Sequence, residues 1–418
     1  MGLLVKNTIL SLISMSKHKK VAVIGGGAAG FFAALSVAEH YPTAKITLFE
    51  KTSKVLAKVK ISGGGRCNVT HNCNDITDLI KAYPRGGRAL KSMFHEFQPK
   101  DTIHWFEKRN VPLKTEEDGR IFPKSDDSQS IIDCLEKACK KTNITIKLSS
   151  AVQKLSPEDS QWKLHFEHGE VIVDNVIITT GGSPKLDGFQ WLSNLGHTII
   201  PPVPSLFTFN MPNESIKQLM GLVAGQTKVR ILGTKIKTEG PLLITHWGMS
   251  GPAILKASSF GARELADLDY SFTIQVQWLS ESLAEIEKLF SKTLKHHPHK
   301  KAISINPLPI PNRLWIYFLE KIKLPKDRRW NEIGQKNLHR IINLLMNDQY
   351  QVQGKTTFKE EFVTCGGVSL KDIHLKTMES KKNKGLYFAG EVLDIDAITG
   401  GYNFQAAWSG GYVAGQLK

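Results

Sequence analysis

The sequence predicts an α/β protein in which a discontinuous domain with a parallel sheet carries an insert of different character. The first observation is the segment 20–51, which is typical of a buried strand, a glycine turn, a helix and a second strand. The second is the return of glycine-punctuated strand and helix patterns after residue 355. The third is the proline-rich stretch Ile199–Pro204, which interrupts the first pattern and indicates a domain boundary.

These boundaries divide the chain into five parts. We expect a tail over residues 1–16, the first part of a nucleotide-binding domain over 17–198, a β-rich, barrel-like insert over 199–278, a helical insert over 279–354, and the second part of the nucleotide-binding domain over 355–418. The runs at 227–246 and 269–279 have the character of strands, whereas those at 282–294 and 311–323 have the character of helices.

Composition favours a globular protein, since 41% of the 418 residues are hydrophobic and 22% are charged. Five scattered cysteines, an odd number, do not fit a secreted disulfide framework, and we expect a cytoplasmic protein. The apolar run Thr8–Met15 is too short to span a bilayer, so we expect no membrane partner.

The chain is basic, with 55 Lys and Arg against 39 Asp and Glu and a formal net charge of +16. Such an excess attracts RNA, a phosphorylated cofactor or an anionic surface, although a solvated basic surface is an equally simple interpretation. One candidate RNA-facing surface is a helical region in which basic residues surround Trp330. These residues are Lys321, Lys323, Lys326, Arg328, Arg329, Lys336 and Arg340.

A dinucleotide fingerprint lies between the first strand and the first helix. Gly25, Gly27 and Gly30 fill G-x-G-x-x-G, and Glu50 ends the second strand twenty residues after Gly30. The first glycine permits a tight turn, the second lets a pyrophosphate approach the backbone, and the third lets the helix pack on the sheet. Glu50 is expected to accept hydrogen bonds from a ribose.

Two further glycine segments are expected at the cofactor. "GLYFAGEV" is an apolar strand that ends in Gly390 and Glu391, with Asp394 as an alternative acid, and "TGGYNFQAAWSGGYVAG" then enters a small-residue helix. This ending resembles the closing motif of glutathione-reductase-type flavoproteins, which implies that the acid binds the ribityl chain of a flavin and that the helix amino terminus stabilises negative charge on the reduced ring. In "SGGGRCN", Gly63, Gly64, Gly65 and Arg66 suit a phosphate cradle, although a redox disulfide or a flexible loop is also compatible with this pattern.

Four segments together resemble the BaiN/RdsA-like family of bacterial FAD-dependent oxidoreductases: "VAVIGGGAAG", "KVKISGGGRCNVT", "GPLLITHWGMSGPAIL", and the long stretch from "VTCGGV" to "AAWSG". The resemblance runs from about Lys20 to the carboxyl terminus, and it implies a discontinuous Rossmann-like FAD-binding domain carrying a β-barrel-like and helical insert. It also extends the expected FAD-binding set to Ala28, Ala29, Lys51, Val152, Thr180, Gly181, Gly400, Gly401, Asn403, Phe404 and Gln405.

The chemistry that the resemblance implies is reduction of an activated carbon–carbon double bond, which needs a hydride from the flavin and a proton from a weak acid. Cys67, beside Arg66, and His246 are the candidate proton donors. A merely structural histidine would instead hold its turn by hydrogen bonding. A disulfide between Cys67 and Cys73 is disfavoured because five residues separate them, whereas disulfide-reducing flavoproteins have four.

Three functions remain open from the sequence. The first is a reductase acting on a uridine in ribosomal RNA, the second an oxidoreductase for a small metabolite, and the third a flavin-bound RNA-binding factor without turnover. NAD(P)H is the expected reductant, although no second G-x-G-x-x-G marks a separate site for it. We expect no metal, because the run His296–Lys301 lacks complementary Cys or acidic ligands.

Overall fold

The computed structural model describes residues 18–357 and 363–418, so the expected tail over 1–16 lies outside the described residues. The chain divides into two compact units. The first runs up to Pro202 and resumes over Gly366–Lys418, and the second comprises Val203–Cys365. The chain passes from one unit to the other within β11 (Ile199–Ser205) and again within β19 (Val363–Val368), and these two strands form a two-stranded sheet.

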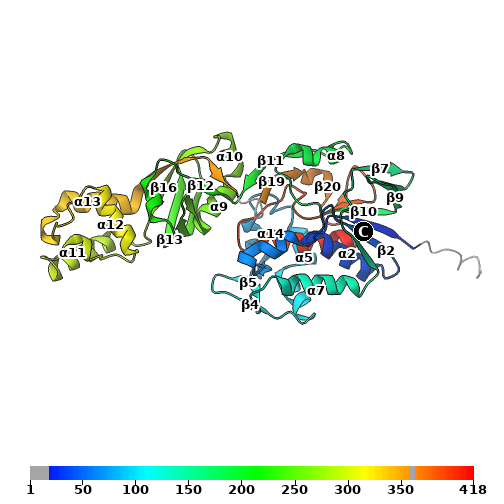
Figure 1. Cartoon of the computed structure of the whole chain (residues 1–418), viewed down its shortest axis with the longest axis horizontal. Helices are drawn as coiled ribbons and strands as arrows, with labels where there is room; N and C mark the ends of the chain where they lie inside the picture. The colour runs from blue at the N-terminus through cyan, green and yellow to red at the C-terminus, as the bar shows by residue number, and fades with distance from the viewer. Residues whose placement is uncertain (1–17, 358–362) are drawn as a thin grey trace, which may run out of the picture. The chain divides into compact units, whose positions relative to one another are not determined.

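The first unit is built on a seven-stranded sheet with the order β20-β21-β22-β10-β1-β2-β6 (Figure 1). Five strands are parallel: β22 (Leu386–Phe388), β10 (Asn175–Ile178), β1 (Lys20–Ile24), β2 (Lys45–Phe49) and β6 (Ile144–Lys147). β20 (Ile373–His374) and β21 (Glu379–Ser380) add an antiparallel edge. Because β22 from the chain's end pairs beside β10, the predicted discontinuous Rossmann-like α/β fold is confirmed.

Two helices rich in small residues pack against each other beside this sheet. They are α2 (Ala28–His40) and α14 (Tyr402–Gly415), and Figure 1 shows α2 beside α7 (Gln129–Lys140). A Cβ atom on Gly411 would lie 2.5 Å from the Ala29 carbonyl oxygen, and one on Gly415 would lie 2.5 Å from Ser36 Cβ. The small residues of both helices therefore permit a close approach of their backbones.

The rest of the first unit consists of short elements. β3 (Thr70–His71), β5 (Arg120–Pro123) and β4 (Leu113–Thr115) form one three-stranded sheet, and β7 (Lys154–Glu158), β8 (Gln161–His165) and β9 (Glu170–Val173) form another. The remaining α-helices are α3 (Ala57–Ile61), α4 (Ile76–Leu79), α5 (Lys91–Glu96), α6 (Pro99–Glu107) and α8 (Gln190–Ser193).

The second unit combines a seven-stranded sheet with helices. Its strand order is β17-β16-β13-β14-β15-β12-β18: β17 (Asp348–Gln353), β16 (Ser271–Gln277), β13 (Val223–Ile231), β14 (Lys237–Ile244), β15 (Gly248–Ser250), β12 (Thr208–Asn210) and β18 (Lys355–Thr356). Its helices are α9 (Pro252–Phe260), α10 (Ala262–Asp267), α11 (Leu283–His296), α12 (Asn312–Lys321) and α13 (Gln335–Asn347).

Strand β17 falls within the stretch 279–354 that we expected to be helical. Its sequence "DQYQVQ" alternates buried and exposed residues, and it pairs with β16 over six residues. The helices α11–α13 are therefore inserted between two strands of one sheet. In the ranges that the structure describes, no helix has both the length and the apolar character needed to cross a bilayer.

A buried ion pair joins the two sequence segments of the first unit. Asp396 is fully buried, and its carboxylate accepts from Arg85 Nε at 2.5 Å and also from Arg85 Nη2. The Arg85 side chain is itself only 13% exposed. Removing one partner would leave the other as a buried charge without its counter-charge, which costs about 3–5 kcal/mol.

We predict that Arg85→Ala lowers the free energy of unfolding by about 3 kcal/mol, because Asp396 then remains buried without its guanidinium. The matched control is Arg88→Ala, which removes an exposed arginine three residues away and should change the value by less than about 0.5 kcal/mol. Urea unfolding followed by circular dichroism measures both. Equal effects of the two substitutions would contradict this assignment.

Candidate cofactor site

The glycines of the fingerprint have different physical roles. A Cβ atom on Gly25, whose φ is +113°, would lie 2.4 Å from the Thr179 carbonyl oxygen, and one on Gly30 would lie 1.9 Å from the Gly25 carbonyl oxygen. These two glycines are therefore required for packing. A Cβ atom on Gly27 would meet no atom of the described residues within 4 Å, so the space beside the start of α2 is open.

The start of α2 suits an anion. Gly27 is the residue preceding the helix, no side chain caps its N–H groups, and its first turn carries no acidic residue. The first N–H groups of a helix lack intrahelical partners and attract negative charge. Open space at Gly27 together with these donors fits the pyrophosphate of a dinucleotide such as FAD.

Glu50 is held in place by the same turn. Its Oε2 accepts from Gly26 N at 2.8 Å, and its Oε1 accepts from Thr52 N at 2.8 Å and from Thr52 Oγ1 at 2.9 Å. A carboxylate has about four lone-pair positions, so capacity for ribose hydroxyls remains. The neighbouring Lys51 is exposed, and Val152 packs at the edge of the first unit's core.

The carboxyl ends of four parallel strands carry expected cofactor residues. Gly25 follows β1, Glu50 follows β2, Thr180 and Gly181 follow β10, and Gly390 follows β22. In open parallel sheets, ligands bind at this edge. Gly390 has a φ of +78°, and a Cβ atom on it would lie 2.9 Å from Ala29 Cβ, so it packs closely on α2.

Glu391 and Asp394 were alternative acids for the flavin side chain. Glu391 Oε2 accepts from Lys58 Nζ at 2.7 Å, so its charge is balanced by a lysine of another segment. The backbone N–H of Asp394 donates to the Val368 carbonyl oxygen at 2.9 Å. A third acid in this segment, Asp396, forms the ion pair with Arg85. This pair could not be predicted from the sequence, because 311 residues separate the two positions.

The residue that precedes helix α14 is Gly401, and no residue with a side chain fits at this position. Gly401 has a φ of +88°, and a Cβ atom on it would lie 2.6 Å from the Thr70 backbone. The carbonyl oxygen of the preceding Gly400 lies 3.2 Å from His71 Nδ1. The first turn of α14 has no acidic residue and no side-chain cap. This amino terminus therefore fits negative charge on a flavin ring.

The side chains of Asn403, Phe404 and Gln405, in the first turn of α14, contact other residues of the protein. Gln405 is fully buried, its Oε1 accepts from Thr70 Oγ1 and Thr102 Oγ1, and its Nε2 donates to Ser409. Asn403 forms two hydrogen bonds with the Ala397 backbone, and Phe404 stacks on Trp408. The side chains of Asn403 and Gln405 therefore hold the start of α14 in place, and cofactor binding by these residues stays a prediction.

The segment "SGGGRCN" folds into a tight left-handed turn. Gly63, Gly64 and Gly65 have φ values of +59°, +70° and +85°, and Cβ atoms on Gly64 and Gly65 would meet nothing within 4 Å. The turn thus offers exposed backbone to a ligand. Their positive φ values favour glycine by themselves, and the space beside Gly64 and Gly65, free of atoms of the described residues, leaves room for a ligand.

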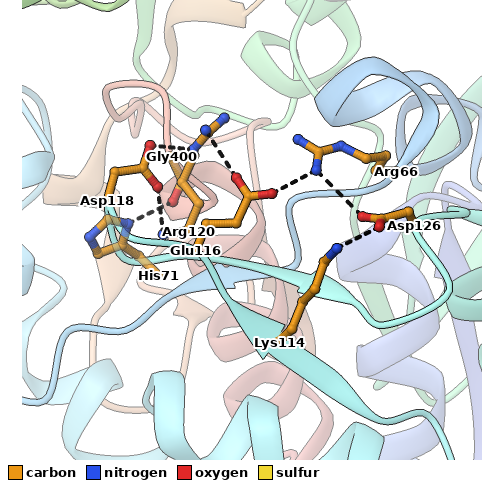
Figure 2. Close-up of polar contacts among 8 residues, drawn as sticks. All are labelled: Arg66, His71, Lys114, Glu116, Asp118, Arg120, Asp126 and Gly400. Carbon is orange, nitrogen blue, oxygen red and sulfur yellow. Dashed lines mark hydrogen bonds and ion pairs between the residues drawn. The ribbon is translucent and has the colours of Figure 1, made fainter.

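The guanidinium group of Arg66 forms ion pairs with two acidic side chains. Its Nη1 lies 2.7 Å from Glu116 Oε1 and 3.4 Å from Asp126 Oδ1, and its guanidinium stacks 4.0 Å above the Phe122 ring. Figure 2 shows this network continuing through Glu116 to Arg120 and through Asp126 to Lys114. Two carboxylates therefore balance the charge of Arg66 in this structure, and its contact with FAD stays a prediction.

Cys67 does not have the environment expected of a proton donor. It is fully buried, and this burial raises the pKa of its thiol to about 12, although a hydrogen bond with Ser62 opposes the shift. The neighbouring Arg66 guanidinium, which could lower the pKa of a thiol, does not offset the effect of burial. Cys67 and Cys73 are both free thiols, so the disulfide interpretation gains no support.

His246 lies in the second unit, on the exposed turn between β14 and β15. This turn is closed by Thr245, whose N–H donates to the Gly248 carbonyl oxygen at 2.8 Å and whose Oγ1 accepts from Trp247 N and Gly248 N. The His246 ring packs beside Trp247 and forms no hydrogen bond with any residue that the structure describes. Thr245 rather than the His246 ring therefore closes this turn by hydrogen bonding, and a role for His246 as proton donor stays a prediction.

A family model described as HI0933-like protein Rossmann domain matches residues 19–417. The chain belongs to this family. It is similar to a 3-dehydro-bile acid delta(4,6)-reductase of Clostridium scindens, with 25% identity covering 95% of this chain and 98% of the relative. It is also similar to the ribosomal RNA dihydrouridine synthase of Escherichia coli, with 28% identity covering 94% and 96%.

Among solved structures, a 3-ketosteroid delta1-dehydrogenase from Sterolibacterium denitrificans has a TM-score of 0.51 at 12% identity, covering 94% of this chain and 98% of that one. This likeness concerns the fold. The family resemblance inferred from the four motifs is confirmed, and the chain is an FAD-dependent oxidoreductase with a Rossmann-type FAD-binding domain.

We predict that Gly27→Ala lowers FAD affinity at least about 10-fold while leaving the apoprotein's unfolding free energy unchanged, because the added methyl group enters open space that the pyrophosphate needs. The matched comparison is Gly30→Ala, whose methyl group collides with the Gly25 carbonyl and should cost about 2 kcal/mol of stability. Flavin fluorescence titration and urea unfolding measure the two effects. Loss of stability in Gly27→Ala would contradict the assignment.

We predict that iodoacetamide at pH 8 alkylates the half-buried Cys73 and leaves Cys67 intact in the folded protein. With a pKa of about 12, only about 1 in 10⁴ Cys67 thiols is ionised at that pH, and the thiolate is the reactive form. Peptide mass spectrometry locates the modified residues, with the urea-unfolded protein as the control in which both react. Faster reaction of Cys67 in the folded state would restore it as an activated thiol.

Proposed function

We propose that the protein is an FAD-dependent reductase of an activated carbon–carbon double bond, and that its substrate is a uridine in ribosomal RNA. The observation that carries the reaction class is that two relatives with nearly full-length coverage are named for ring reductions, a delta(4,6)-reductase and a dihydrouridine synthase. We further propose NAD(P)H as the electron source and the cytoplasm, where ribosomal RNA is found, as the location.

Different residues of the chain bind the cofactor and donate the proton in this reaction. Reduced FAD, when bound, supplies a hydride to one carbon of the double bond. The N–H groups at Gly27 and at the start of α14 bind and orient the cofactor. His246 donates a proton to the neighbouring carbon, a role that suits an exposed imidazole whose ring forms no hydrogen bond to the described residues.

The net charge of +16 favours RNA over an uncharged ring as the substrate. The alternative is a small unsaturated metabolite, which the bile acid reductase at 25% identity favours. The two differ in salt dependence, since RNA binding, which involves many phosphates, weakens steeply as salt rises, whereas binding of a small metabolite with one charge or none weakens little.

The deciding genetic experiment deletes the gene and maps dihydrouridine along ribosomal RNA by reverse transcription and mass spectrometry. We expect loss of dihydrouridine at one position, restored by the wild-type gene and not by the Gly27→Ala gene. An unchanged modification pattern in the deletion strain would remove the RNA substrate and favour the metabolite.

We predict that His246→Ala slows reoxidation of the reduced enzyme by its substrate about 10²-fold with FAD content unchanged, because the proton must then come from water. The control is His299→Ala, which removes another exposed histidine of the same unit and should leave the rate unchanged. Anaerobic stopped-flow measurement over pH 5–9 reports both rates. An unaltered rate in His246→Ala would exclude it as the proton donor.

A further inference from the structure

A basic groove lies on the sheet of the second unit, and all its lining residues belong to that unit. The groove has a volume of about 650 Å³. Its strands are β13, β14 and β16, and the ends of α9 and α13 contribute its sides. The residues that matter for its chemistry are Lys228, Arg230, Lys237, Lys256, Phe260 and Gln275.

The strand register gathers cations on one exposed face of this sheet. Arg230 on β13 pairs directly with Lys237 on β14, and Lys228 lies two residues from Arg230, so its side chain shares the same face. Like charges directly opposite one another in a sheet are destabilising. Lys228 itself lies opposite Glu239, so the directly opposed Arg230 and Lys237 are the pair that an anionic ligand would stabilise.

These cations are available to a ligand. Lys228, Arg230 and Lys237 are exposed, and none forms an ion pair with a residue in the described part of the chain. Lys256 Nζ donates to the backbone carbonyl oxygen of Glu239 at 3.3 Å, a contact that leaves its charge uncompensated. Glu239 is the acidic residue that lines the groove, and the four basic side chains leave the groove with a net positive charge.

The groove also offers an aromatic surface and amides. Phe260 at the end of α9 is 47% exposed, so its ring is accessible to a ligand in the groove. Gln275 donates through Nε2 to Asn347 Oδ1 at 2.6 Å, and Gln277 donates to the Leu279 carbonyl oxygen at 2.8 Å, so each amide is oriented by one contact. Cations that follow a backbone beside an aromatic face are the pattern of single-strand nucleic acid binding.

The helical surface inferred from the sequence lacks this combination. Trp330 is fully buried and unable to stack on a base, and Lys321 is paired with the buried Asp348 at 2.5 Å. Lys326 lies 3.4 Å from Glu320. The aromatic residue and part of the charge expected at 321–340 are therefore used inside the unit, and the basic groove is the better candidate.

We propose that the basic groove binds the phosphate backbone of a single-stranded RNA segment, with a base stacked on Phe260. This inference rests on the proposed function, since it names the surface that holds the RNA whose uridine is reduced. An anionic membrane would meet a recessed surface here, and an acidic peptide would not require an exposed aromatic side chain. The partner that suits cations, amides and an aromatic face together is RNA.

The test uses the full-length holoenzyme and a fluorescein-labelled, uridine-containing single-stranded RNA, with binding measured by anisotropy at several salt concentrations. The variant Lys228→Gln, Arg230→Gln, Lys237→Gln should bind at least about 10-fold more weakly, and the slope of log affinity against log salt should fall by about 2, since each single-strand phosphate contact contributes about 0.7. The charge-matched control on α11 is Lys288→Gln, Lys292→Gln, Lys295→Gln, which should change affinity less than about 2-fold.

A second variant tests the aromatic contact separately. Phe260→Ala should weaken RNA binding about 10-fold without changing the salt slope, because stacking involves no phosphate. Equal losses in the groove and control variants, or binding of phosphatidylserine vesicles with no RNA affinity, would overturn the proposal. If the groove variants lose RNA binding as expected but wild-type enzyme forms no dihydrouridine, the groove stands and the proposed substrate fails.

Discussion

The close packing of α2 on β1 through Gly30 and Gly25 is the constraint on which the rest of the first unit depends. Since a Cβ atom on Gly30 would come within 1.9 Å of the Gly25 carbonyl oxygen, the helix can approach the strand only at this glycine. That approach fixes the amino terminus of α2 at the carboxyl edge of the sheet, where β2, β10 and β22 also end. Gly411 of α14 then packs against Ala29 of α2, so the second helix is positioned by the first.

The sequence predicted features that depend on neighbours in the chain. The strand, turn and helix around Gly25–Gly30, the acid Glu50, and the return of the domain after the insert all follow local patterns, and the fold class is confirmed. The side-chain partners of Arg66 and Gln405 could not be predicted, because they are distant in the sequence. Arg66 pairs with Glu116, 50 residues away, and Gln405 bonds to Thr70, 335 residues away. No local pattern reports such contacts.

Charge and aromatic content illustrate the same limit in the second unit. Sequence spacing drew attention to Trp330 and the basic residues around it, yet Trp330 packs in the core beside Trp315. The groove residues come from three strands and two helices, and the pairing of β13 with β14 brings Lys228, Arg230 and Lys237 onto one face. A charge count therefore predicts an anionic partner, whereas strand register is needed to locate it.

The most direct test of the central claim is an anaerobic single turnover with unmodified ribosomal RNA. The holoenzyme is reduced with NADPH, excess reductant is removed, and RNA from the deletion strain is added while the absorbance of oxidised flavin is followed. The account predicts that this absorbance returns and that dihydrouridine forms in equal amount at one position. Flavin that stays reduced in the presence of this RNA, but is reoxidised by a small cyclic enone, would contradict it.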